Sequence, residues 1–173
     1  IADDFPLFDA GDLAVSMRKL NLLIVVDPQD GRVKWWHIGP WLRQHDPEFK
    51  AGGTIVLFNN NTYISEPDAN THSQIMEIDP ITNDARVLYG NATDQKMLSI
   101  IRGKVQANED GRLLITEFEA GRAFEVDAAG NVIWEYINRY DADRVAEITE
   151  ARSYPASYFT VDDWTCPSRA QND

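Results

Sequence analysis

Cysteine is almost absent from this 173-residue sequence, which contains only Cys166. A single cysteine permits no disulfide within the chain, and it excludes zinc and iron–sulfur sites built from several cysteines. Histidine is also scarce, because His37, His45 and His72 are the only three. We therefore expect no metal site, and chemistry that needs an imidazole has to use one of these three positions.

Long apolar runs and the common catalytic motifs are missing as well. No stretch approaches the roughly 18 to 20 apolar residues that span a bilayer, so no membrane-spanning segment is expected. The sequence lacks Gly-x-Ser-x-Gly, a phosphate-binding glycine loop, His-Glu-x-x-His and a dinucleotide fingerprint. These absences argue against serine hydrolases and nucleotide-dependent enzymes, and no cofactor is predicted.

Positive charge is in short supply. Sixteen basic residues stand against 28 acidic ones, which gives a net charge of −12 and a pI near 4.6. Such a surface repels phosphate backbones, so nucleic acid is not an expected partner. Hydrophobic residues make up 43% of the sequence, enough for a folded core in one domain of ordinary size.

What the sequence does contain is a repeat. Three stretches share one order: a glycine turn, an apolar strand, a second strand ending in aspartate, a turn and a third strand ending in an aromatic residue. The strand-ending aspartates, Asp27, Asp79 and Asp127, recur about every 50 residues. Short strands with this period are typical of β-propeller blades. A plain antiparallel sandwich is the alternative.

The predicted fold is all-β, with about three four-stranded antiparallel sheets as propeller blades. Residues 1–173 form one partial propeller domain, with blades near 5–41, 42–92 and 98–138 and a tail over 139–173. Closed propellers have about 4 to 8 blades, so we expect the remainder of the propeller, or a second chain, as a partner. Residues 141–152 are expected to form a short helix, or residues 145–151 a strand that returns to the channel.

Two side chains stand out by position. His45 lies in an Arg-Gln-His-Asp-Pro run on an expected innermost strand, where propellers usually bind ligands. Arg18 ends an otherwise apolar strand and offers a fork of donors that suits a sulfate, phosphate or carboxylate. Position alone leaves alternatives open: His45 as a channel residue that only hydrogen-bonds, and Arg18 as one half of a surface salt bridge. Arg102 has the same ambiguity as Arg18.

Several of these runs resemble the arylsulfotransferase family, whose fold is related to PQQ-type propellers. They are residues 11–18, 26–28 and 39–41, then Gln-His-Asp-Pro at 44–47 and Ile-Val-Leu-Phe-Asn-Asn at 55–60. The resemblance covers about residues 5 to 160. It implies that the chain is the C-terminal half of a six-bladed propeller with its active site in the central channel.

The resemblance also implies an activity. Family members move a sulfuryl group from a phenolic sulfate ester to a phenol, without a nucleotide donor, through a sulfated histidine and with ping-pong kinetics. By motif, His45 matches the nucleophile and Arg18 the arginine that binds the sulfuryl oxygens. Arg102, Asn59 and Asn21 are the further substrate-binding candidates. For Asn59 and Asn21 the alternative is a turn or strand-end residue without a role in binding. A periplasmic or extracellular location is also implied.

Two other functions stay open at this point. One is a non-catalytic propeller that binds a protein or glycan partner. The other is a quinone-cofactor oxidoreductase, for which the matching cofactor contacts are not visible in the sequence.

Overall fold

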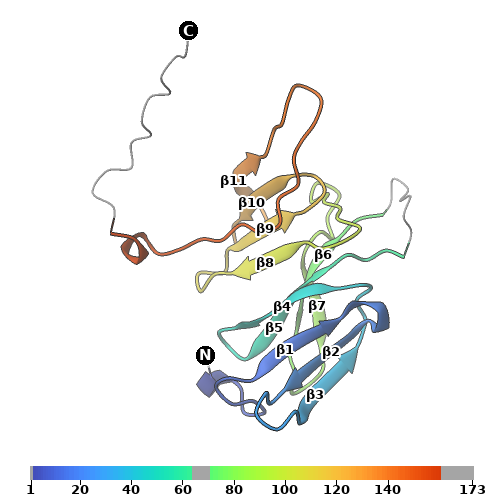
Figure 1. Cartoon of the computed structure of the whole chain (residues 1–173), viewed down its shortest axis with the longest axis vertical. Helices are drawn as coiled ribbons and strands as arrows, with labels where there is room; N and C mark the ends of the chain where they lie inside the picture. The colour runs from blue at the N-terminus through green and yellow to red at the C-terminus, as the bar shows by residue number, and fades with distance from the viewer. Residues whose placement is uncertain (1, 64–70, 161–173) are drawn as a thin grey trace.

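The structure is a computed structural model that describes residues 2–63 and 71–160. This part of the chain is built from three antiparallel β-sheets and has almost no helix (Figure 1). Its helical elements are three short 3₁₀ turns: η1 (Ala2–Asp4), η2 (Arg18–Leu20) and η3 (Ala156–Tyr158). None of the described helices has the length and apolar character needed to cross a membrane. Cys166 and the end of the tail lie outside the described residues.

The all-β fold is confirmed, and four strands per sheet is confirmed for two sheets. The second sheet has the order β4 (His45–Lys50), β5 (Thr54–Asn59), β6 (Gln74–Ile78) and β7 (Ala85–Tyr89). The third has the order β8 (Lys104–Ala107), β9 (Leu113–Glu117), β10 (Arg122–Val126) and β11 (Val132–Ile137).

For the first sheet the four-strand prediction is wrong. It contains only β1 (Leu13–Met17), β2 (Leu22–Val26) and β3 (Val33–Ile38). In the repeat, β1 corresponds to β5 and β9, the second strands of the other sheets. Residues 2–12 form η1 and turns instead of a leading strand, because Phe5 and Phe8 pack into the core beside Trp35 and Phe49.

The repeated aspartates close one hairpin in each sheet. Asp27 Oδ1 accepts the backbone N–H of Gln29, and Asp79 and Asp127 accept the N–H of the residue two positions later in the same way. This is the Asx-turn, in which a short carboxylate replaces a backbone acceptor. The period of about 50 residues in the sequence therefore reflects the same turn built three times.

The second sheet is buried on both faces. Alternate residues of β5 point in opposite directions, so Ile55 and Leu57 pack toward the first sheet, while Val56 and Phe58 pack toward the third. All four side chains are essentially buried. A strand covered on both sides reads as a continuous apolar run, which explains the uninterrupted Ile-Val-Leu-Phe sequence.

The first strand of each sheet in chain order lies close to the first strand of the next sheet. β4 contacts both β1 and β8 (Figure 1). The chain after β11 then returns to β8, where Gln106 exchanges two hydrogen bonds with the backbone of Ser153. Residues 141–152 form neither the predicted helix nor the predicted strand, apart from one isolated bridge between Arg139 and Val145.

The outer face of the first sheet is apolar and open. Its register places Leu13, Val15 and Met17 of β1 opposite alternate residues of β2, which in turn pair with Trp36 and Ile38 of β3. These five side chains are exposed. Trp134 and Tyr136 on β11 are exposed on the third sheet. The first and third sheets thus each carry exposed apolar side chains of the kind found at interaction surfaces.

One glycine at the junction of the second and third sheets gives a direct test of this packing. Gly103 has φ of +93°, and a Cβ there would lie 2.6 Å from the buried ring of Phe58. We expect Gly103→Ala to lower the free energy of unfolding by about 2–4 kcal/mol, since strain and overpacking add. Gly31→Ala is the control, because Gly31 also has positive φ but an open surrounding. Equal losses in denaturant titrations of both variants would contradict the packing argument.

Candidate active site

Four chain segments meet around His45. They are the end of β1 with η2, the start of β4, the residues after β5, and the segment 97–102 that leads into β8. The Ser16 hydroxyl donates to the Gln44 carbonyl at 2.8 Å, which fastens the His45 segment to β1. Asn60 fastens it to the segment 97–102, because its Nδ2 donates to the carbonyls of Ser99 and Arg102 at 2.7 and 2.8 Å. The site is therefore shared by all three sheets.

Asn60 determines which nitrogen of His45 carries the proton. Both Nδ2 hydrogens of Asn60 are directed to backbone carbonyls, so its Oδ1 is the atom that faces His45 Nδ1, at 2.6 Å. An amide oxygen only accepts, so Nδ1 must be the N–H of the ring. In the neutral imidazole, Nε2 then holds the lone pair. This arrangement leaves Nε2 as the ring atom that can accept a proton or attack an electrophile.

The surroundings also keep the ring neutral. Burial lowers the pKa of His45 below its usual value, and the positive charge of Arg18 lowers it further. The bond to Asn60, the Asp46 carboxylate and the Arg43 backbone act in the opposite direction without reversing the shift. A half-buried imidazole near a guanidinium pays a desolvation and repulsion penalty when it protonates. His45 is therefore mainly unprotonated near neutral pH.

Arg18 lies at the junction of β1 and η2 and is only partly used by the protein. Its Nη2 donates to the carbonyl of Ile100 at 3.2 Å, which holds the side chain in place. Its Nε is buried, with no hydrogen-bond partner among the described residues. Burial lowers the pKa of Arg18, and the charge of Arg43 lowers it further, but an arginine stays protonated at any working pH. A buried, unpaired N–H on a fixed cation suits an oxyanion.

The other predicted residues support this frame. Asn59 accepts the N–H groups of Leu42 and Asn61 and donates to Gln74, so its amide is directed to protein partners. Asn21 accepts the N–H of Arg43 at 2.8 Å and donates to the Tyr63 hydroxyl.

Arg102 is exposed, and its guanidinium lies 4.5 Å from the ring centroid of Phe118. Of the five predicted site residues, the structure thus brings His45 and Arg18 together. It places Asn21, Asn59 and the Arg102 backbone around them as supports.

The backbone near His45 is unusual. Asn21, Arg43, Asp46, Asn61 and Arg102 all have left-handed φ values between 52° and 58°. Arginine rarely adopts this conformation, which costs of order 1 kcal/mol or more and persists only where surrounding contacts enforce it. Asp46 is held in this way, because its carboxylate accepts from Lys104 Nζ at 3.1 Å and from the Val105 N–H at 3.0 Å. Such strain concentrates at functional sites.

Sequence reasoning missed Asn60, Arg43 and Tyr63. Asn60 is the first residue after β5 and the middle one of three consecutive asparagines, and that polar triplet at the end of a buried strand was the one available signal. Its partners, Ser99 and Arg102, are about 40 residues away in the sequence. A local sequence pattern does not predict a contact over such a separation.

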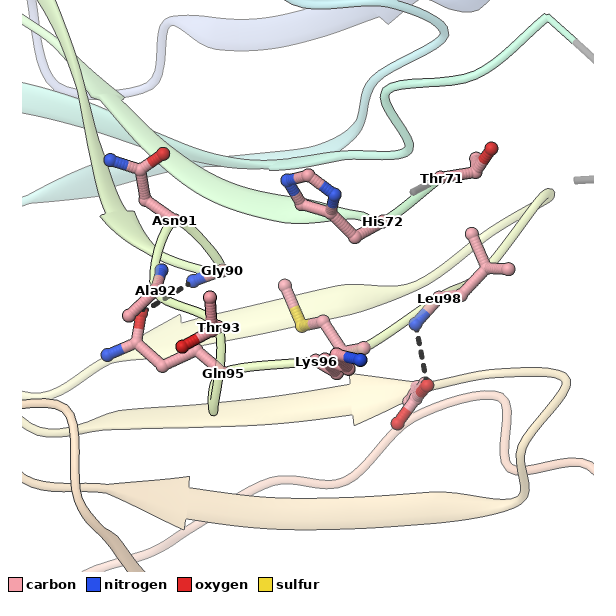
Figure 2. A pocket seen from close by; sticks show the side chains of 11 residues that line it. Thr71, His72, Gly90, Asn91, Ala92, Thr93, Gln95, Lys96 and Leu98 are labelled. Atoms are coloured by element: carbon pink, nitrogen blue, oxygen red, sulfur yellow. Dashed lines mark hydrogen bonds between the residues drawn. The ribbon is translucent and has the colours of Figure 1, made fainter. Parts of the chain in front are cut away.

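A cavity of about 580 Å³ lies next to this region (Figure 2). Its lining includes His72, Thr93, Met97, Leu98 and Glu117, but not His45. The Leu98 N–H donates to the buried Glu117 carboxylate at 2.7 Å. The cavity wall and the His45 site are joined by the chain itself, since Met97 and Leu98 lead directly to Ser99, the partner of Asn60.

The described residues thus form an all-β protein in which repeated antiparallel sheets bring an imidazole of lowered pKa close to an arginine with a buried, unpaired N–H. The chain belongs to the arylsulfotransferase (ASST) family, whose model matches residues 2–139. This confirms the resemblance read from the sequence at the level of the family. Membership gives the family of the chain, a family named for sulfotransferase activity.

Comparison with solved structures adds little to this assignment. One similar chain is the crystal structure of a protein of unknown function from Bacteroides caccae, with 10% identity and a TM-score of 0.36. The match covers 72% of this chain and 57% of that one. No curated protein matches this chain.

Proposed function

We propose that the protein transfers a sulfuryl group from a phenolic sulfate ester to a phenol, with His45 as the nucleophile and Arg18 as the sulfuryl-binding residue. The observation that carries the proposal is the fixed tautomer of His45, with Nδ1–H on Asn60 and Nε2 unprotonated next to a cation. Family membership supports the reaction class.

In the first half-reaction, Nε2 of His45 attacks sulfur as the bond from sulfur to the phenolic oxygen breaks. The phenolate leaves with the electron pair of that bond, and the sulfuryl group remains on the ring. Because the attacking imidazole was neutral, the ring gains positive charge. The Asn60 oxygen stabilises this charge through Nδ1–H. In the second half-reaction a phenol oxygen attacks sulfur, the electron pair of the S–N bond returns to Nε2, and the phenol proton passes to solvent water. The imidazole is then neutral again.

Arg18 supplies the complementary electrostatics. The three sulfuryl oxygens keep their negative charge throughout, and the guanidinium offers a buried N–H already fixed in position. A donor held in place before the reaction stabilises the transition state without reorganisation at the moment of transfer. The same cation adds to the effect of burial in lowering the pKa of His45, so Arg18 contributes both to binding of the group and to activation of the nucleophile.

Steady-state kinetics test the proposal. Rates measured against both an aryl sulfate donor and a phenol acceptor should give parallel double-reciprocal lines, as expected for a covalent intermediate. Rapid quenching with donor alone should yield a His45 peptide carrying one added sulfuryl group. Intersecting lines without a modified peptide would reject the covalent route. Absence of transfer across a broad phenol panel would favour the binding-module alternative.

The pH dependence follows from the direction of the His45 shift. Since its pKa is lowered, kcat/KM should stay level through neutral pH and decline only below the usual histidine range near 6.5. In Arg18→Met the repelling charge is gone, so the pKa of His45 should rise. NMR titration of the ring C–H signals measures this without requiring activity. Arg32→Met, at the far turn of the first sheet, is the control, and an equal pKa in Arg18→Met and wild type would contradict the pairing.

We also infer that the propeller is completed by further sheets, from the same polypeptide or from a second chain. The support is the open apolar face of the first sheet, formed by Leu13, Val15, Met17, Trp36 and Ile38, and the exposed Trp134 and Tyr136 on the third. A location in the periplasm or outside the cell remains part of the proposal.

A further inference from the structure

Three arginines near His45 form no ion pair with a carboxylate of the described residues, although the chain has 28 acidic residues. Within the described ranges, none of the salt bridges involves Arg18, Arg43 or Arg102, whereas most other arginines pair with an aspartate or glutamate. In a protein with a net charge of −12, such a local excess of positive charge favours an anionic ligand.

Arg43 is held more firmly than an ordinary surface arginine. Its backbone N–H donates to Asn21 Oδ1 at 2.8 Å, and its φ is +54°. Its guanidinium lies over the ring of Tyr63, 5.3 Å from the centroid. Asn21 also donates to the Tyr63 hydroxyl. One asparagine therefore fixes both partners of the cation–π pair.

The position of Arg43 differs from that of Arg18. The Asn21 N–H, at 3.4 Å from the Arg18 carbonyl, joins the two arginine segments, and the charge of Arg43 lowers the pKa of Arg18. The charge of Arg18 acts on His45, whereas Arg43 contributes its backbone there. Arg18 is thus the inner cation, nearer the imidazole, and Arg43 is the outer one.

We propose that Arg43 and Tyr63 form a subsite for the aryl part of the substrate and select phenolic sulfates that carry a second anionic substituent, such as a carboxylate. The subsite rests on the proposed function, because Arg18 then binds the sulfuryl group and leaves Arg43 for the remainder of the molecule. Tyr63 is 54% exposed as a residue and lies beside the guanidinium of Arg43. A flat aromatic anion matches both groups, because its ring can stack on Tyr63 while its anionic substituent pairs with the Arg43 guanidinium.

The test compares two donors, phenyl sulfate and 4-carboxyphenyl sulfate, in wild type, Arg43→Met and Arg32→Met. Wild type should prefer the carboxylated donor by about tenfold in kcat/KM, mainly through KM, as a charge-assisted contact predicts. In Arg43→Met the preference should fall to about one. Arg32→Met removes the same charge from an exposed turn and should keep the preference. No preference in wild type, or an undiminished one in Arg43→Met, would overturn the subsite.

Binding measurements separate this proposal from the sulfotransferase assignment. Affinities of phenol and 4-hydroxybenzoate, measured by calorimetry, require no turnover. A preference for 4-hydroxybenzoate that is lost in Arg43→Met and weakens as salt screens the charge supports the subsite, even if no sulfuryl transfer is detected. Equal affinities in wild type reject the subsite, even if transfer is confirmed.

Discussion

Replacement of His45 by asparagine is expected to reduce sulfuryl transfer by about 10⁴-fold, since the covalent route loses its nucleophile. The remaining rate would come from Arg18 and from substrate binding alone. Asparagine retains a polar side chain of modest size at this half-buried position, so the fold should persist. Initial rates with a chromogenic aryl sulfate give the activity, and thermal unfolding shows whether the variant is folded.

The matched control for this variant is His72→Asn. His72 lines the cavity of about 580 Å³, and it is not part of the His45 hydrogen-bond frame described above. Its replacement should leave the formation of the sulfated enzyme intact. Substantial transfer by His45→Asn, or an equal loss in His72→Asn, would show that another residue is the nucleophile.

Replacement of Asn60 by leucine should have the second largest effect. The change removes the acceptor for His45 Nδ1 and the donors to the carbonyls of Ser99 and Arg102. We expect activity to fall by about 10²-fold, as for other groups that orient a reacting imidazole. Stability should fall by about 2–4 kcal/mol, because buried polar groups lose their partners.

A structural role alone would not change the His45 tautomer, so the decisive measurement is ¹⁵N NMR of the ring. Asn60→Leu should populate the tautomer with hydrogen on Nε2. Asn60→Asp keeps the acceptor and should keep the tautomer, while its charge raises the pKa of His45 and moves the acid limb to higher pH. Asn59→Leu is the control: it disrupts a neighbouring buried amide, and the tautomer should stay unchanged.

Features that depend on residues close together in the sequence could be predicted from it. The turns at Asp27, Asp79 and Asp127 are local, so their spacing predicted the repeated sheets. His45 and Arg18 stood out because each is a polar side chain at the end or start of a strand. The missing fourth strand of the first sheet was not predicted, because Phe5 and Phe8 resemble strand residues in sequence and act as core anchors in turns.

The contacts that hold the site together could not be predicted from the sequence. The hydrogen bonds of Asn60 and the pairing of Arg43 with Tyr63 join segments far apart in sequence, so only the packed sheets reveal them. Asn21 and Asn59 were selected as substrate-binding candidates by type and position. Their amides are instead engaged with Arg43, Tyr63, Leu42 and Gln74 in the described structure.

The segment 97–102 has a consequence for any shortened version of this protein. Its backbone carbonyls accept hydrogen bonds from two side chains. Asn60 donates to Ser99 and Arg102, and Arg18 donates to Ile100. A polypeptide cut after Tyr89 would retain the imidazole, the guanidinium and every atom that takes part in bond exchange. It would lose the backbone carbonyls that hold the side chains of Arg18 and Asn60 in place. The two reacting groups would then be present without a fixed relative position.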